Sequence, residues 1–324
     1  MRLVTFSRRD TPSAMRVGVM LAEGILDATG AQERRGTQSR TCASMLSLIR
    51  GGSTALAELE DLARNPNPAD ILPVEQSILA SPLPRPEQIR CFSTFEEHVI
   101  RSSEVMLRKI AEGSADPVQA LADLAKKLPV KVPKIFYERP LYYKGNRFSV
   151  VGPDVEVKWP EYSRTVDFEL ELACVIGRQG KDISAQNAGP YIFGYTICND
   201  LSARDEQAIE MQAPLGPAKG KDFDGGLCMG PCIVTTNEFR REDAQMIVRV
   251  NGQEWSRGHA RNMYHSFERM IAYVSRSETI YPGEVFLSGC VGGGSGVELQ
   301  RFPQRGDVIE FEIAGIGRLS NRIV

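Results

Sequence analysis

The stretch TVDFELELACVIG, residues 165–177, alternates acidic and apolar side chains over its first half. Because successive side chains of a β-strand point to opposite faces, we expect Asp167, Glu169 and Glu171 to share one face of a strand. Carboxylates two residues apart on one face repel each other. A hard divalent cation removes that repulsion and prefers oxygen ligands, so the pattern indicates a metal site. The alternative is a half-exposed strand with an acidic face in water.

The stretch GYTICNDLSARDEQ, residues 194–207, places polar side chains at the end of an apolar strand. We expect that strand to end near Asp200, where a side chain can be directed into a cleft. A helix that carries Arg204 and Gln207 follows, and Ser202 is placed to cap it. The alternative is that Asp200 and Ser202 are only helix caps.

Two lysines lie among glycines in PLGPAKGKDFDGGLCMGP, residues 214–231. Glycine lets the backbone approach a neighbouring group closely, so Lys219 and Lys221 are candidates for contact with a ligand. The alternative is an ordinary surface loop.

The stretch FSTFEEHVIRS, residues 92–102, contains His98, and the other two histidines of the chain follow only after residue 250. A single histidine of this kind is either a proton-transfer group or, more commonly, a structural side chain.

A run of glycines lies in LSGCVGGGSGVELQRF, residues 287–302. No GK[ST] motif follows it, and we see no helical pattern after it. A nucleotide-binding loop is therefore not expected.

The composition is that of a globular protein, because 42% of the 324 residues are hydrophobic and 25% are charged. A net charge of −2 excludes a general electrostatic attraction to nucleic acid or anionic lipid. No apolar run reaches the ~18 to 20 residues that a membrane helix needs, and the first residues lack a secretory pattern. The scattered cysteines are typical of reduced thiols, and the close pair Cys228 and Cys232 lacks the further ligands of a zinc site. We expect a cytoplasmic protein with no nucleic-acid or membrane partner.

Proline clusters between residues 65 and 88, and proline at that density breaks helices and central strands. We therefore expect a small β-rich N-terminal domain over residues 1–75, a linker over 76–88 and a catalytic domain over 89–324. In the first domain, strands are expected at Leu3–Phe6, Arg16–Met20 and Gly24–Asp27, and helices at Ala43–Ile49 and Ala55–Arg64.

Strands dominate the rest of the chain and do not alternate with helices as βαβ units, which weighs against a Rossmann or barrel fold. The fold class expected is α+β and β-rich. Strands are predicted at Ile89–Ser93, Glu169–Ile176, Tyr191–Asn199, Cys232–Thr235, Met246–Val250, Val285–Ser288, Val308–Ile313 and Arg318–Ile323, with a hairpin turn at Asn251-Gly252 and helices at Arg101–Ile110, Pro117–Lys127 and Ser266–Ser275.

Taken together, these stretches resemble the fumarylacetoacetate hydrolase family in order and spacing. DFELEL resembles its paired-glutamate strand, NDLSARDEQ its turn and helix with an aspartate, GKDF its lysine loop, and RGDVIEFEIAGIGRLSNRIV its closing strands. The resemblance implies a mixed β-sandwich or roll, a homodimer, and a divalent cation, Mg²⁺ or Mn²⁺ with Ca²⁺ as a further option. Members act on small 2-oxo or diketo acids.

The resemblance also implies roles for individual residues. It makes Glu169, Glu171 and Asp200 the metal ligands, His98 the general base and Glu298 the acidic partner of that base. It makes Lys221 a further catalytic residue, which would hold developing negative charge, and the substrate-binding side chains would be Arg204, Gln207, Tyr143 and Cys290.

The chain departs from the patterns of the family at four positions. Cys91 replaces an aspartate that is a fourth metal ligand, Ser93 replaces a tyrosine, and Cys290 replaces a threonine. Other branches have a glutamate three residues after the histidine, where this chain has Arg101. We expect Cys91 to stay outside the ligand shell, because Mg²⁺ and Mn²⁺ favour oxygen over thiolate.

Three functions are compatible with these residues. The first hypothesis is a metal-dependent hydrolase that cleaves a carbon–carbon bond in a β-diketo acid such as an acylpyruvate. The second is a decarboxylase, isomerase, tautomerase or dehydratase of a related 2-oxo acid, which needs no hydrolytic water. The third is a non-catalytic ligand-binding member, which the departures at Cys91, Ser93 and Cys290 would support.

Overall fold

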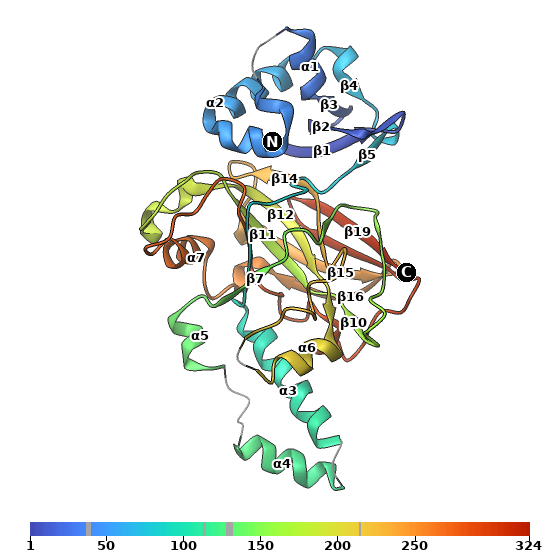
Figure 1. Cartoon of the computed structure of the whole chain (residues 1–324), viewed down its shortest axis with the longest axis vertical. Coiled ribbons are helices and arrows are strands. Elements are labelled where there is room, and N and C mark those ends of the chain that lie inside the picture. Colours follow the sequence, from blue (N-terminus) through green and yellow to red (C-terminus); the bar gives the residue numbers. More distant parts are fainter. Residues whose placement is uncertain (37–39, 113–114, 128–131, 214) are drawn as a thin grey trace.

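The computed structural model describes residues 1–36, 40–112, 115–127, 132–213 and 215–324. Within them, twelve strands form one mixed sheet in the order β4-β3-β2-β1-β14-β12-β11-β17-β6-β7, with β5 paired to β1 and β8 to β14 (Figure 1). The bounds of these strands are β1 Arg2–Arg8, β2 Thr11–Leu21, β3 Gly24–Asp27, β4 Ile71–Leu72, β5 Ser77–Leu79, β6 Ile89–Phe92, β7 Tyr142–Gly145, β8 Val150–Val151, β11 Leu170–Ile176, β12 Ile192–Asp200, β14 Leu227–Thr235 and β17 Val285–Leu287.

Two smaller sheets and eight α-helices complete the described structure. The five-stranded sheet has the order β16-β15-β18-β19-β9, with β16 Gln253–His259, β15 Gln245–Val250, β18 Val308–Ile313, β19 Gly317–Ile323 and β9 Glu156–Val157; β10 Val166–Asp167 pairs with β13 Ser202–Ala203. The helices are α1 Ala28–Arg34, α2 Met45–Arg64, α3 Glu96–Glu112, α4 Pro117–Lys127, α5 Lys134–Glu138, α6 Arg204–Glu210, α7 Phe267–Val274 and α8 Gly296–Leu299. The prediction of a β-rich α+β fold is confirmed.

Strand β11 lies inside the large sheet, between β12 and β17, and all its residues are buried. Its side chains alternate between two apolar cores: Leu170 and Leu172 pack in one, whereas Ala173 and Val175 pack in the other. Burying a leucine of this kind stabilises the fold by roughly 1.5–3 kcal/mol. By this alternation Glu171 continues the face of Ala173 and Val175 at the start of the strand.

The N-terminal strands form a layer with α1 and α2 at one end of the molecule (blue in Figure 1). Strand β1 pairs with β14, so this layer continues the large sheet. The segment Ser77–Leu79, which we predicted as linker, forms β5 on β1 because this short run carries no proline. The division into domains at residues 75 and 88 stays a prediction.

Local sequence patterns located most elements to within a few residues. Helix α2 is interrupted at Gly52, which has a φ of 58°, between the two helical segments that we predicted. The predicted hairpin joins β15 to β16, with Asn251 and Gly252 both at positive φ, as a type I′ turn requires. Helix α3 begins at Glu96, earlier than the predicted Arg101, and therefore carries His98.

One prediction, on the segment after the glycine run, was wrong, and Asp167 in the acidic stretch is the reason. Asp167 ends strand β10, and β11 begins at Leu170. The Asp167 carboxylate accepts hydrogen bonds from the backbone N–H groups of Gly296 and Val297, at 2.7 and 3.0 Å, which begin helix α8. We had predicted no helix after the glycine run, and the cap that stabilises it comes from a side chain 129 residues away.

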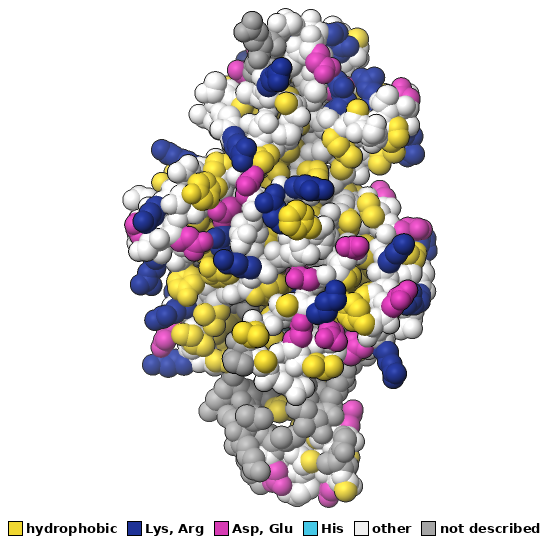
Figure 2. All heavy atoms as spheres, in the orientation of Figure 1, with side chains coloured by type: hydrophobic (Ala, Val, Ile, Leu, Met, Phe, Trp, Pro, Cys, Tyr) yellow, Lys and Arg dark blue, Asp and Glu magenta, His cyan; other side chains and the backbone are white. Residues whose placement is uncertain are grey.

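The surface carries both signs of charge. Figure 2 shows basic and acidic side chains interspersed over the face in view, with apolar side chains between them. Among the described helices, none combines the length and apolar character needed to cross a membrane. The cytoplasmic location stays a prediction.

Candidate active site

Three buried carboxylates meet where β11 and β12 lie side by side. One oxygen each of Glu169, Glu171 and Asp200 lies within 4.8 Å of the others. The antiparallel register pairs Leu170 with Asn199, and the backbone N–H of Asp200 donates to the carbonyl of Glu169 at 3.1 Å. The prediction that these three side chains converge agrees with this geometry, whereas the alternative of an acidic face in water does not.

Lysine 221 enters this cluster from the glycine-rich loop. Its Nζ lies 2.7 Å from Glu169 Oε2 and 2.9 Å from Asp200 Oδ2, and it donates to the backbone carbonyl of Asp200 at 3.1 Å. Burial acts to lower the pKa of Lys221, but Asp200 and Glu169 raise it above its usual value. In this arrangement Lys221 is a cation.

Glu171 is the least compensated of the three carboxylates. Its Oε2 accepts from the backbone N–H of Gly289 at 2.8 Å. Burial, followed by the charges of Asp200 and Glu169, raises the pKa of Glu171 well above its usual value. Glu169 differs, because Lys221 and Arg204 outweigh burial and hold its pKa below the usual range. Three converging carboxylates with this excess of negative charge are a donor set that fits a hard divalent cation.

Arg204 and Gln207 lie on helix α6, next to the same carboxylates. The Arg204 guanidinium donates to Asp167 Oδ2 at 2.7 Å, to Glu169 Oε1 at 2.8 Å and to Gln207 Oε1 at 2.8 Å. Ser202 does not cap this helix, contrary to our prediction: its hydroxyl donates to the carbonyl of Asp200 at 3.2 Å, and Ala203 occupies the cap position. Asp167 forms an ion pair with Arg204 on α6 and accepts hydrogen bonds from the start of α8, so it connects the two helices.

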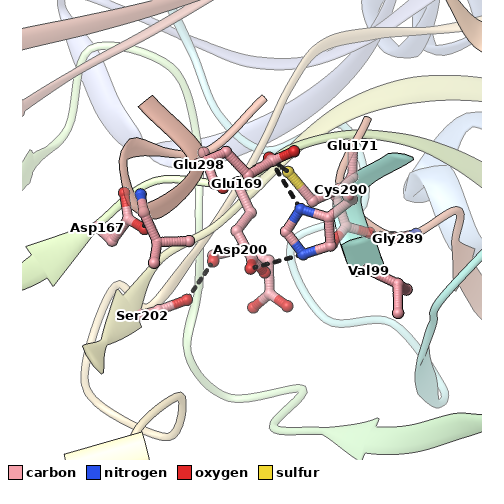
Figure 3. A network of polar contacts seen from close by, with 12 residues as sticks. Val99, Asp167, Glu169, Glu171, Asp200, Ser202, Gly289, Cys290 and Glu298 are labelled. Carbon is pink, nitrogen blue, oxygen red and sulfur yellow. Dashed lines mark hydrogen bonds and ion pairs between the residues drawn. The ribbon is translucent and has the colours of Figure 1, made fainter. Parts of the chain in front are cut away.

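His98 and Glu298 form a hydrogen-bonded pair although they are 200 residues apart. His98 Nδ1 lies 2.8 Å from Glu298 Oε2, and its Nε2 lies 3.9 Å from Glu169 Oε1. Glu298 also accepts from the backbone N–H of Gly293 and the hydroxyl of Ser295, both at 2.8 Å. Figure 3 shows Glu298 and Cys290 close to Glu169 and Asp200.

The environment of Glu298 keeps it ionised. Burial acts to raise the pKa of Glu298, but the bonds from His98, Gly293 and Ser295 hold it below its usual value. Because an ionised carboxylate only accepts hydrogen bonds, His98 Nδ1 must be the donor. The lone pair of a neutral His98 is then on Nε2, which faces the carboxylate cluster.

Tyr143 and Cys91 lie opposite each other on β7 and β6. The Tyr143 hydroxyl donates to Asp200 Oδ2. Cys91 is buried and Tyr143 is half-buried. Desolvation raises the pKa of each well above its usual value, with the Asp200 charge as the next cause. Cys91 is near the carboxylates but is not one of the three side chains whose ligand atoms converge.

Cys290 lies beside the hydrogen-bonded pair of His98 and Glu298. Its Sγ is 3.9 Å from Glu298 Oε2, and the side chain is buried. The predicted contact of Cys290 with substrate stays a prediction, as do the roles of Lys221, Arg204, Gln207 and Tyr143.

Sequence reasoning missed Ser295 and the capping role of Asp167. Ser295 and Glu298 have the S-x-x-E spacing of a helix start, and that pattern could have predicted α8 and the bond that orients Glu298. No local pattern indicates that Asp167 reaches α8.

Comparison with known proteins places this geometry in context. Residues 109–324 match the family model described as fumarylacetoacetate hydrolase, C-terminal. A mitochondrial oxaloacetate tautomerase from Xenopus laevis is 30% identical over 332 residues, which span 100% of this chain and 90% of the relative. The structure of a fumarylacetoacetate hydrolase from Exiguobacterium antarcticum superposes with a TM-score of 0.73 at 25% identity, covering 100% of this chain and 99% of that one. A maleylpyruvate hydrolase from Sphingobium, solved with manganese(II) and pyruvate, has the same fold, with a TM-score of 0.71 at 21% identity and the same coverage.

Proposed function

Because the chain belongs to the fumarylacetoacetate hydrolase family, we propose that it is a divalent-metal-dependent enzyme that interconverts the keto and enol forms of a 2-oxo acid of the oxaloacetate type. The observation that carries this proposal is the His98–Glu298 pair, whose free Nε2 faces the three carboxylates. Its further support is the oxaloacetate tautomerase that aligns along the whole chain.

Glu169, Glu171 and Asp200 would hold the cation, Mg²⁺ or Mn²⁺. When bound, the cation would supply Lewis acidity to the 2-oxo and carboxylate oxygens of the substrate, which makes the neighbouring carbon more acidic. The same carboxylates also form ion pairs with Lys221 and Arg204, and these pairs hold the two cationic side chains at the site before any substrate binds.

The substrate oxygens would be held by the cationic and polar side chains around the cluster. Lys221 and Arg204 are fixed by ion pairs, so their charges are in place before the enolate forms, which is the condition for effective electrostatic stabilisation. Gln207 is fixed by Arg204, and Tyr143 by Asp200. Cys290 would contact the substrate from the side of Glu298.

The proton transfer is assigned to His98. Nε2 takes a proton from the carbon between the two carbonyl groups of the keto form. The C–H electron pair then forms the carbon–carbon double bond, the C=O π pair moves to the 2-oxo oxygen, and the imidazolium gives its proton to that oxygen. Glu298 stabilises the imidazolium through Nδ1–H. No atom is gained or lost overall, and the reverse sequence converts the enol to the keto form.

The second candidate is hydrolysis of a carbon–carbon bond in an acylpyruvate. It is favoured by the fumarylacetoacetate hydrolase structure that superposes on the whole chain, and by Glu298, which matches the acidic partner of the base in the hydrolase branch. In this reaction His98 takes a proton from water, the hydroxide adds to the distal carbonyl, and the carbon–carbon bond breaks to give a carboxylic acid and the enolate of pyruvate, which is then protonated.

The two candidates differ in what becomes of the carbon skeleton. Purified protein with Mn²⁺ is given enol-oxaloacetate or an acylpyruvate, the enol absorbance is followed, and the products are identified by NMR. We expect faster loss of the oxaloacetate enol with the four-carbon acid intact, and no cleavage of acylpyruvates. Release of pyruvate and a second acid, without accelerated ketonisation, would replace the first candidate by the second.

A further inference from the structure

A second set of potential metal ligands lies beside the carboxylate cluster. One ligand atom each of His98, Cys290 and Glu298 lies within 4.8 Å of the other two. His98 Nδ1 and Cys290 Sγ are 2.8 and 3.9 Å from the same oxygen, Glu298 Oε2. Glu298 Oε2 therefore already contacts both of the other potential ligands.

The donor types of this set differ from those of the first. An imidazole nitrogen, a thiolate sulfur and a carboxylate oxygen are the ligands of Zn²⁺, which binds tetrahedrally with water in a fourth position. Mg²⁺ and Mn²⁺ instead favour sites of oxygen atoms alone. We propose that His98, Cys290 and Glu298 form a second metal site that binds Zn²⁺, and that zinc at this site inhibits the enzyme.

The charge of the site permits a second cation. Its buried carboxylates are Asp167, Glu169, Glu171, Asp200 and Glu298, and its cations are the buried Lys221 and the half-buried Arg204. With every carboxylate ionised, five negative and two positive groups leave three negative charges when His98 is neutral. One divalent cation on the three carboxylates leaves one negative charge, which a zinc ion at the second site would find attractive.

His98 is the most exposed of the three proposed zinc ligands. The His98 side chain is 17% exposed to solvent, whereas the Glu298 side chain is fully buried. Cys290 is 4% exposed. Zinc would thus enter past the His98 ring and meet the sulfur at the inner end.

Zinc binding has a defined proton balance. The S–H bond of Cys290 breaks, a Zn–S bond forms, and the thiol proton passes to water. The imidazole proton moves from Nδ1 to Nε2 through solvent, so that the Nδ1 lone pair binds the ion. Nε2 then carries a proton and can no longer accept one. This inhibitory consequence rests on the proposed role of His98, whereas zinc binding itself does not.

The direct test uses Co²⁺ as a spectroscopic substitute for Zn²⁺, added to protein already saturated with Mg²⁺. Co²⁺ bound to a thiolate gives a charge-transfer band in the near ultraviolet, and Co²⁺ bound to carboxylates alone does not. We expect the band in the wild type, its loss in Cys290→Ser, and its retention in Cys91→Ser. Cys91 is the matched control because it is the buried thiol beside the carboxylate cluster.

A chelator competition measures the same site with zinc. Cys290→Ser should weaken Zn²⁺ binding by at least the ~10- to 100-fold that loss of an outer-shell partner costs a metal site, with Mn²⁺ affinity unchanged. No band in the wild type, or a band that survives in Cys290→Ser, would overturn the site.

Activity provides the third measurement, with each variant compared with its own zinc-free rate. Zinc should inhibit the wild type and Cys91→Ser but not Cys290→Ser. Equal inhibition of Cys290→Ser would place zinc at the carboxylates and overturn the proposal. If no 2-oxo acid is converted, the cobalt band still decides the site, so failure of the proposed function and failure of the zinc site are distinguishable.

Discussion

At the scale of single residues, His98 and Glu298 act as one unit in the proposed chemistry. His98→Ala removes the base and should lower turnover by about 10²- to 10⁴-fold, while Mn²⁺ affinity is retained. Glu298→Gln should lose nearly as much, because the amide cannot stabilise an imidazolium, and the double variant should lose little more. Steady-state rates and calorimetric Mn²⁺ titrations of the three variants check this.

The matched control for that series is His259→Ala, since the His259 side chain caps a turn by accepting from the backbone N–H of Arg261. It should keep wild-type turnover. Additive losses in the His98/Glu298 double variant would mean that the two side chains act independently.

Glu171 reports whether a cation holds the carboxylate cluster together. Mn²⁺ should raise the Tm of the wild type, because the ion binds only the folded state. Glu171→Gln should abolish that rise, since it removes one of three charged ligands, yet the metal-free variant should be no less stable than the metal-free wild type, because repulsion from Asp200 and Glu169 is relieved. Thermal unfolding with and without Mn²⁺ measures both effects. A full Mn²⁺ response in Glu171→Gln would contradict the assignment of this ligand.

Cys91 marks the position at which the chain departs from the hydrolase branch. Cys91→Asp would add a hard oxygen ligand beside Glu171 and Asp200, and should tighten Mn²⁺ binding in a calorimetric titration. Cys91→Ser, which adds no charge, should leave the affinity close to that of the wild type. Unchanged Mn²⁺ affinity in Cys91→Asp would show that this position lies out of reach of the ion.

At the scale of secondary-structure elements, Asp167 joins three parts of the chain. Its buried carboxylate accepts from Arg204 on α6 and from the two N–H groups that begin α8. Asp167→Asn leaves the Arg204 charge only partly paired and should cost about 3–5 kcal/mol, the range for breaking a buried ion pair. Urea unfolding gives the free energy, and Glu254→Gln, which breaks an exposed ion pair with Arg257, should leave the free energy of unfolding close to that of the wild type. A cost for Asp167→Asn as small as that of the control would remove the proposed link between α6 and α8.

The sequence predicted those elements whose pattern is local. Alternating and apolar runs located β11, β12, β15, β18 and β19, because burial on a sheet imposes a period of two. Strand β14 begins at Leu227, earlier than the predicted Cys232, and α8 was missed, because their starts depend on partners far along the chain. For the site, charge repulsion and oxygen preference led to the converging carboxylates, but the pairing of His98 with Glu298 followed only from the resemblance to the family.

At the scale of the whole molecule, the homodimer stays a prediction on revised grounds. The resemblance to the family implies it, but the last strand offers no open edge for pairing, because β19 lies between β18 and β9. Large apolar side chains are instead exposed at and after α6, where Ile209, Met211 and Leu215 keep 62%, 56% and 92% of their exposure. Light scattering at micromolar concentration should give about twice the 35.8 kDa of one chain. A mass near 36 kDa would rule the dimer out.

The central claim is that His98, beside a metal-binding carboxylate cluster, moves a proton at the carbon next to the 2-oxo group. The most direct measurement is hydrogen exchange at that carbon, with oxaloacetate in D₂O followed by NMR against the uncatalysed rate. With Mn²⁺, the wild type should accelerate deuterium incorporation, and His98→Ala or a metal-stripped sample should not. Incorporation at the uncatalysed rate by the metal-loaded wild type would contradict the claim.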